Sequence, residues 1–498
     1  MERWISPGRS SWSVIAVIAA FLVASAPATA HGGSSGHGDR HDRGDRGNQG
    51  VARAALPPGA VRHIFVIELE NEDASTTFGP GSPATYLNGT LVPQGELLEN
   101  YYATGHASLD NYIAQISGQA PTEETSADCL GPSTNLSTLI GSYDDLLPGN
   151  LDPNQQLYPG QVDGHGCIYP AFVPTIANQL DRLDPPNPFT HVAAWRDYDE
   201  DMGNQPTGRE LGAPDPLGGL DCAHPALNGT DNTNAASPAT ATEPADQYAT
   251  RHNGFMYFHS VIDNTAECDA NVVPLGKVAV GTPSRFDGTR LPDTFSGHLA
   301  NDLRSTWTTP KFGWITPNLC DDGHDSTCAG PNTIGQIGAG AGGLHGADEF
   351  LAHWVPLLEA SPAYRLGQML IVITFDEGNS ADGTACCGET PGPDNPTPGF
   401  SQLLAPIYVQ LGLPIPNPAN GGGRVGALLL DPRYVEPGSV DTAGQYNHYS
   451  ALRSYEDLLG ITRGGTDGLG HLGFAGAKGL VPFGRDVFNR PFGRFSWR

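Results

Sequence analysis

The chain of 498 residues is short of basic side chains, with 26 Lys and Arg against 54 Asp and Glu and a formal net charge of −28 at pH 7. This charge repels polyanions, which argues against nucleic acid or an anionic membrane surface as a partner. The sequence also lacks internal repeats, and its G-x-S-x-G match, GGSSG at 32–36, lies in a Gly-rich segment and not at the strand-to-helix turn of lipase-type serine hydrolases. The charge and the missing turn thus argue against two common classes of function.

Long apolar runs are almost absent, and the one present, WSVIAVIAAFLVASA, lies near the N-terminus behind Arg3 and Arg9. The small residues ATA follow it, as at signal-peptidase sites, so we expect a signal peptide over residues 1–30, cleaved after Ala30. No paired arginine precedes the run, which favours the general secretory route. No second run is long enough to span a bilayer, so the mature chain is predicted to be secreted, without stable membrane insertion.

The segment after the signal peptide has almost no apolar residues and begins HGGSSGHGDRHDRGDRGNQG. Such a composition cannot bury a core, so residues 31–56 are predicted to be a disordered leader rich in Gly, His, Asp and Arg. The rest, 57–498, is predicted to be one catalytic domain, because large α/β enzymes often run this long. The polar, Pro-rich stretch 227–246 is better explained as a surface insertion than as a boundary.

Eight cysteines in an exported chain indicate disulfides. Their scattered spacing and the oxidising compartment argue against a zinc site with Cys ligands. Pairing neighbours in sequence order gives the hypothesis Cys129–Cys167, Cys222–Cys268, Cys320–Cys328 and Cys386–Cys387.

Short apolar runs rich in Val, Ile and aromatic residues are typical of strands covered by helices on both faces. The predicted strands are 63–71, 190–198, 311–318, 369–377 and 404–412. Amphipathic patterns over 347–362 and 449–460 predict helices between or after them. Strands that alternate with helices predict an α/β fold with a mainly parallel sheet.

Three of these runs end in side chains that can bind a cation: Glu70 and Asn71, Asn318, and Asp376 and Glu377. One such pair is ordinary punctuation where a strand meets water. Because ligands bind at the carboxyl ends of strands in open α/β sheets, three together favour a shared site. Carboxylate and amide oxygens suit a divalent cation, whose identity the sequence leaves open.

The segment GHASLDNYIAQISGQ predicts a helix from Leu109 to Ser117 that stops at Gly118, with Ser108 at the N-cap. Ser108 is then either a plain helix cap or a nucleophile at a phosphate-binding helix N-terminus, with its hydroxyl acidified by a cation. Asn111, one turn further on, could donate to a phosphoryl oxygen.

Two further groups carry chemistry. The loop PNLCDDGHDSTC follows a strand and contains Asp321, Asp322, His324 and Asp325. His448 stands just before a helix, where a single histidine is more often structural than catalytic. The catalytic interpretation of His448 depends on the other candidate site residues in the chain.

Six motifs, in this order, resemble the phosphoesterase family of bacterial and fungal acid phosphatases and phospholipases C, a branch of the alkaline phosphatase superfamily. They are ENEDASTTFG, GHASLDNYIAQISGQ, HNGFMYFHS, PNLCDDGHD, TFDEG and YNHYSALRSYEDLLG. The resemblance runs from about His63 to the C-terminus. It implies an alkaline-phosphatase-like three-layer α/β/α sandwich.

The resemblance also implies roles for individual residues. The metal ligands would be Glu70, Asn71, Ser108, Asp376 and Glu377. The catalytic residues would be Ser108, His324 and His448, and the substrate contacts Asn111, Asn318 and Asp325. His324 and His448 would either hold a second ion or clamp phosphate as protonated imidazoles.

The expected function is a secreted, metal-dependent phosphomonoesterase of the acid phosphatase type that acts on a small phosphate ester. The start ENEDASTTFG differs from the ENRSFDHYFG-like start of phospholipase C relatives, which favours the phosphatase side. A phospholipase C that acts on lipid headgroups is the first alternative. A secreted binding protein that keeps the fold without turnover is the second.

Overall fold

The computed structural model describes residues 52–130, 140–148, 158–185, 193–282, 284–285, 289, 291–324, 342–379, 382–389, 391–393, 395 and 421–491. Residues 51–498 form one compact unit. The expected signal peptide, the strand 404–412 and Asp325 lie outside the described residues.

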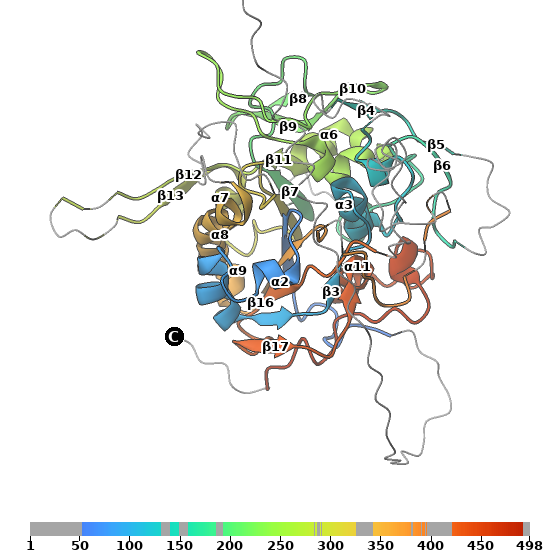
Figure 1. The fold of residues 1–498 in the computed structure, drawn as a ribbon, viewed down its shortest axis with the longest axis vertical. Helices are drawn as coiled ribbons and strands as arrows, with labels where there is room; N and C mark the ends of the chain where they lie inside the picture. The colour runs from blue at the N-terminus through green and yellow to red at the C-terminus, as the bar shows by residue number, and fades with distance from the viewer. Residues whose placement is uncertain are drawn as a thin grey trace, which may run out of the picture. The chain divides into compact units, whose positions relative to one another are not determined.

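An eight-stranded sheet forms the centre of this unit, with the order β11-β7-β14-β1-β15-β16-β2-β17 (Figure 1). Its strands are β1 His63–Leu69, β2 Glu96–Leu98, β7 Trp195–Asp199, β11 Val272–Pro274, β14 Phe312–Thr316, β15 Met369–Phe375, β16 Ala427–Leu430 and β17 Ser439–Asp441. Four of the five predicted strands are thereby confirmed, at β1, β7, β14 and β15. All residues of β1 and β15 are buried, as their unbroken apolar runs require.

The sheet is mainly parallel. β1 lies between β14 and β15 and pairs with both in parallel, with Ile64 opposite Phe312 and Leu370. Only β16 runs against its neighbours, β15 and β2. The predicted α/β class is confirmed, and the carboxyl ends of β7, β14, β1 and β15 meet at one edge.

Helices cover both faces of the sheet. In Figure 1, strands β7, β1 and β16 run between α8 (Gly343–Ala360) and α9 (Pro362–Arg365) on the left and α3 (Ser108–Ser117) and α11 (His448–Leu458) on the right. On its face, α8 buries the apolar side chains Phe350, Leu351, Trp354 and Leu358. None of the helices in the described residues combines the length and apolarity that a membrane span requires.

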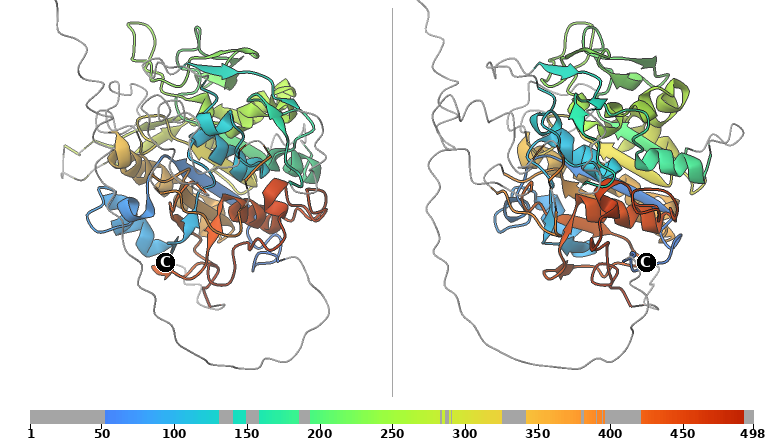
Figure 2. Two further views of the ribbon diagram at one scale, coloured as in Figure 1. Left: turned by 45° about the vertical axis from the view of Figure 1, so that its right-hand side comes forward. Right: turned by 90° about the vertical axis from the view of Figure 1, so that its right-hand side faces the viewer.

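A region of short elements lies at the β11 edge of the sheet, where β9 packs against β11. It contains β4 Gly141–Tyr143, β8 Leu211–Pro214, β9 Leu220–His224, β10 Gly229–Asp231, α6 Thr265–Asn271 and α7 His298–Asp302. Figure 2 shows the green strands of this region beyond one end of the sheet in both views. Residues 227–246 belong to it, and β10 pairs with β4.

The folded unit begins earlier than the sequence indicates. Ala54 and Leu56, placed in the leader by composition, are both buried. The backbone amide of Ala54 donates to Asp457 on α11 at 2.8 Å, and Arg53 forms an ion pair with the same carboxylate. Residues 53 and 54, expected in the leader, therefore contact α11 as part of the folded unit.

The disulfides follow the predicted pairing. The structure contains Cys129–Cys167, Cys222–Cys268 and Cys386–Cys387. Cys320 is also disulfide-bonded, and its predicted partner Cys328 lies outside the described residues.

Candidate active site

The parallel pairing of β1 and β15 brings their polar ends together. The amide of Asp376 donates to Leu69 O at 2.8 Å, and the amide of Asn71 donates to the Asp376 carboxylate at 2.9 Å. Asn71 has a φ of 53°, a left-handed conformation that Asn tolerates better than most residues. The sharp turn after β1 thus places Glu70 and Asn71 against the end of β15.

Glu70 is the centre of this edge. Its side chain is completely buried and accepts a hydrogen bond from Ser108 Oγ at 2.7 Å and another from Tyr112 OH at 2.6 Å. Ser108 and Tyr112 share one face of α3 because they are four residues apart. The helix therefore presents a serine hydroxyl and a phenol to one carboxylate.

Ser108 is the first residue of α3 rather than its cap. The cap position is Ala107, whose side chain makes no capping hydrogen bond, and the Ser108 hydroxyl donates to Glu70. Instead, the amide of Leu109 donates to the Asp128 carboxylate at 2.9 Å. Since Asp128 takes over part of the capping, the Ser108 hydroxyl is directed to Glu70. The predicted stop at Gly118 is confirmed by its φ of 70°.

Buried oxygen atoms without partners test whether this edge suits a cation. Asp376 Oδ2 and Asn71 Oδ1 are both buried without a hydrogen-bond partner. Burial, and then the charge of Asp376, raise the pKa of Glu70 well above its usual range. Buried carboxylates of this kind need protons or a positive ion. The oxygens of Glu70, Asn71 and Asp376 therefore fit a divalent cation.

Glu377 pairs with a histidine outside this group, although its charge, after burial, raises the pKa of Asp376. Its carboxylate lies 3.2 Å from Nδ1 of His106, whose Nε2 lies 2.8 Å from Asp382 O. Burial lowers the pKa of His106, but the hydrogen bond and charge of Glu377 outweigh it and the pKa is raised. In the described residues, no three acidic or histidine side chains of this edge bring ligand atoms within 4.8 Å of one another.

His448 lies behind Asp376 and is completely buried. Its Nε2 lies 2.7 Å from the backbone carbonyl of Asp376, and its Nδ1 lies 3.1 Å from Tyr101 OH. A carbonyl only accepts, so Nε2 carries the hydrogen and Nδ1 accepts from Tyr101. Burial lowers the pKa of His448 to about 4, so the ring is neutral.

The two asparagines expected to contact substrate have their amides engaged within the protein. Asn111 Oδ1 accepts from the amides of Thr104 and Gly105, and its Nδ2 donates to the carbonyls of Gly105 and Ala107. Asn318 Nδ2 donates to Asp201 at 2.9 Å, and its Oδ1 accepts from the amides of Cys320 and Asp321. In this conformation both side chains hold loops in place.

His324 is exposed, at the end of the described segment 291–324. Burial raises the pKa of Asp128, and the charges of Arg251 and His324 act in the opposite direction, which places both side chains near that carboxylate. Asp325 lies outside the described residues. His324 is therefore the expected catalytic histidine that faces solvent here.

Sequence reasoning missed several members of the site. His252 Nε2 lies 3.4 Å from Glu70, and its ring stacks on Tyr112 with 5.7 Å between centroids. Burial lowers the pKa of His252 well below its usual range. His252 opens the motif HNGFMYFHS, so a signal was present without an assigned role. For Tyr112, the four-residue spacing from Ser108 was the available signal.

Two curated proteins are similar to this chain. A probable acid phosphatase from Kluyveromyces lactis is 22% identical over 321 residues, which are 64% of this chain and 48% of that protein. A phosphate-repressible acid phosphatase from Penicillium chrysogenum is 26% identical over 340 residues, 66% of this chain and 53% of that protein. The chain thus spans about half the length of the curated relatives it matches.

Among solved structures, a protein of the alkaline phosphatase superfamily from Vibrio parahaemolyticus has a TM-score of 0.35 and 12% identity, and covers 81% of this chain and 68% of its own. The family model of the Phosphoesterase family matches residues 81–462, which is most of the chain. That match includes Ser108, Asp376, Glu377 and His448. The chain therefore belongs to the Phosphoesterase family.

Proposed function

We propose that this protein is a secreted, metal-dependent phosphomonoesterase in which Ser108 is the nucleophile. The observation that carries the proposal is the 2.7 Å hydrogen bond from Ser108 Oγ to the buried Glu70 carboxylate at the start of α3. This arrangement gives the hydroxyl a proton acceptor, and the positive end of the helix dipole favours a phosphate group. The relatives named as acid phosphatases support the same activity.

In this proposal Ser108 Oγ attacks phosphorus and passes its proton to Glu70. A bond from Oγ to phosphorus forms while the bond from phosphorus to the ester oxygen breaks. His324, exposed at the edge of the site, gives a proton to the departing oxygen. Water then attacks phosphorus and gives a proton to His324, the bond from phosphorus to Oγ breaks, and Oγ regains its proton from Glu70 as inorganic phosphate leaves.

Glu70, Asn71, Asp376 and Ser108 would hold the divalent cation, and Glu377 would join them on leaving His106. The cation, when bound, would neutralise phosphate charge and favour the ionised hydroxyl. We assign positioning roles to His448, which holds the backbone of Asp376, and to Asn111 and Asn318, which hold loops. Asp325 stays a predicted substrate contact, and a second ion near His324 and His448 stays a prediction.

Secretion is part of the proposal. The three disulfides in the described residues are of the kind that persists in oxidising compartments. They support export of the mature chain by the expected signal peptide.

The test compares hydrolysis of p-nitrophenyl phosphate and its phosphocholine analogue by the wild type, Ser108→Ala and Ser117→Ala. Ser117 is a buried serine at the other end of α3 and serves as the matched control. We expect the wild type and Ser117→Ala to prefer the monoester, and Ser108→Ala to stay folded with most turnover lost. Added alcohol should also receive phosphate from the wild type, because a covalent intermediate can be intercepted.

Three results would contradict the proposal. Preference for the phosphocholine ester would identify a phospholipase C. Inactivity on both substrates would indicate a binding protein of the same fold. A folded Ser108→Ala protein with a near wild-type rate would move the attack from serine to water.

A further inference from the structure

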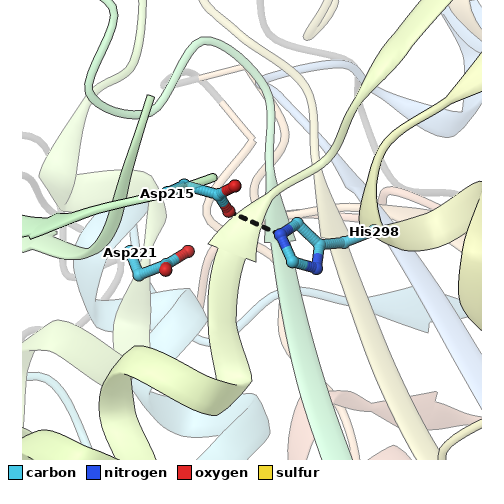
Figure 3. Close-up of side chains that lie close together, drawn as sticks. All are labelled: Asp215, Asp221 and His298. Atoms are coloured by element: carbon cyan, nitrogen blue, oxygen red, sulfur yellow. Dashed lines mark hydrogen bonds and ion pairs between the residues drawn. The ribbon is translucent and has the colours of Figure 1, made fainter. Parts of the chain in front are cut away.

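A second group of ligand side chains lies away from Glu70, at the β11 edge of the sheet. Asp215 follows β8, Asp221 lies in β9, and His298 is the first residue of α7 (Figure 3). One ligand atom from each lies within 4.8 Å of the other two. Among the described residues, no other three acidic or histidine side chains bring their ligand atoms this close together.

The β8–β9 hairpin that carries the two carboxylates is held by backbone hydrogen bonds and a disulfide. The amide of Asp215 donates to Gly219 O at 3.1 Å, and the amide of Gly218 donates to Asp215 O at 3.0 Å. Asp215 Oδ1 also accepts from the amide of Leu217. One residue beyond Asp221, the disulfide Cys222–Cys268 joins β9 to α6. The hairpin therefore presents both carboxylates from a rigid frame.

Asp221 has an oxygen with no partner. The residue is 9% exposed, and its Oδ1 is buried without a hydrogen bond. Figure 3 shows its carboxylate pointing toward Asp215 and His298. An unsatisfied carboxylate oxygen in a buried site is costly unless a ligand or proton reaches it.

The neighbouring positive charge is already shared. Arg196 Nη1 lies 3.0 Å from Asp302 and 3.1 Å from His298 Nδ1. Burial, and then Asp215, raise the pKa of Asp221 to about 8. Asp215 already pairs with His298 Nε2 at 2.5 Å, so among the described residues it is Asp221 that is short of a positive partner.

We propose that Asp215, Asp221 and His298 bind a borderline divalent cation of the Zn²⁺ type, separate from the Glu70 edge. Two carboxylates and one imidazole are ligands that Zn²⁺ accepts, at about 2.0–2.2 Å. Ligand atoms around such an ion lie about 3–4 Å apart, so Asp215 Oδ2 and His298 Nε2, which are now 2.5 Å apart, would separate as the ion enters between them. The ion would join the β8–β9 hairpin to α7 and stabilise this region.

His298 Nδ1 now accepts from Arg196 Nη1, and binding of an ion at Nε2 would move the ring hydrogen to Nδ1. The ring would then have to turn away from Nη1, while Arg196 keeps its bond to Asp302. A cavity of about 680 Å³, lined by Leu217–Gly219 and Ser296–His298 among others, borders the group. It has room for a water molecule to complete the coordination.

The experiment uses the full chain carrying Asp376→Asn as the background. This substitution weakens cation binding at the proposed active site. After chelation and dialysis, the bound Zn²⁺ is counted and the unfolding temperature measured with and without Zn²⁺. The variants are Asp221→Asn, which is isosteric, and Asp269→Asn, which removes a neighbouring charge outside the group. We expect the background and Asp269→Asn to bind one equivalent and unfold at a higher temperature with Zn²⁺, and Asp221→Asn to lose both effects.

A second measurement covers the case in which Asp221→Asn fails to fold. Co²⁺ bound to the background protein should give a visible absorption band that His298→Gln lacks. Equal Zn²⁺ content and equal thermal shifts in Asp221→Asn and Asp269→Asn would overturn the proposal. So would a Co²⁺ spectrum unchanged by His298→Gln. Because neither readout uses turnover, the result is independent of the proposed phosphatase activity.

Discussion

At the residue scale, the candidate active site depends on what Glu70 contacts. Its two oxygens accept from Ser108 and Tyr112, and His252 lies 3.4 Å away. These contacts orient the carboxylate toward the serine hydroxyl. They also exclude other orientations, since the side chain is fully buried.

Replacing Tyr112 with Phe should therefore reduce catalysis. The change leaves the ring on His252 but removes the 2.6 Å hydrogen bond to Glu70. Hydrogen bonds to charged groups contribute about 1.5–3 kcal/mol, so kcat/KM should fall about 10- to 100-fold. Tyr143→Phe, which removes a buried hydroxyl bonded to Met256 O, should lose stability and keep kcat/KM. Equal rates in both variants would contradict the role of Tyr112.

The neutral ring of His448 predicts a dependence of stability on pH. Its pKa is lowered by burial to about 4, whereas in the unfolded chain it is about 6.5. Above pH 6.5 both states are neutral and the contribution is complete. As the pH falls from 6.5 to about 4, His448 becomes protonated in the unfolded chain but stays neutral in the folded protein. The free energy of unfolding therefore decreases.

His448→Gln tests this directly, because glutamine can donate to Asp376 O and accept from Tyr101 without titrating. Urea unfolding at pH 7 and pH 5 should show that the wild type loses about 2 kcal/mol more than the variant over this interval. The same loss in both proteins would show that His448 is already protonated or that another group dominates.

At the element scale, α3 depends on a residue outside it. Asp128 accepts from the amide of Leu109 and stands in the left-handed region with a φ of 53°. Asp128→Ala should destabilise the protein by about 2 kcal/mol, since it removes an N-terminal acceptor and strains the backbone. Asp128→Asn keeps an acceptor and tolerates this φ, so its loss in urea unfolding should be much smaller. Equal losses of stability in the two variants would contradict the capping role of Asp128.

At the scale of the whole molecule, metal removal should affect turnover and stability together. Chelation would leave the buried carboxylates of Glu70 and Asp376 without a positive partner, so hydrolysis should stop and the unfolding temperature should fall. Asp376→Asn should weaken cation binding and activity by several kcal/mol. Returning the cation should restore the wild type and not the variant. Full activity after verified removal would contradict the metal-dependent mechanism.

The central sheet and its disulfides were determined by the sequence itself. β1 and β15 are unbroken apolar runs, and such runs predict buried strands wherever they occur. Parallel pairing then brought Glu70, Asn71 and Asp376 to one edge, as predicted. Disulfide partners close in sequence also followed from the order of the cysteines.

Only the tertiary structure decided what each side chain contacts. On local grounds Ser108 could be a cap or a nucleophile. In the fold, the Leu109 amide donates to Asp128 and the Ser108 hydroxyl donates to Glu70. Glu377 was expected beside Asp376, but it pairs with His106 from a distant segment. A side chain adopts one of several rotamers with similar local energies, so packing and hydrogen bonds from remote segments select among them. For the same reason, the sequence does not predict that Asp215, Asp221 and His298 lie together, since their spacing follows no recognisable pattern.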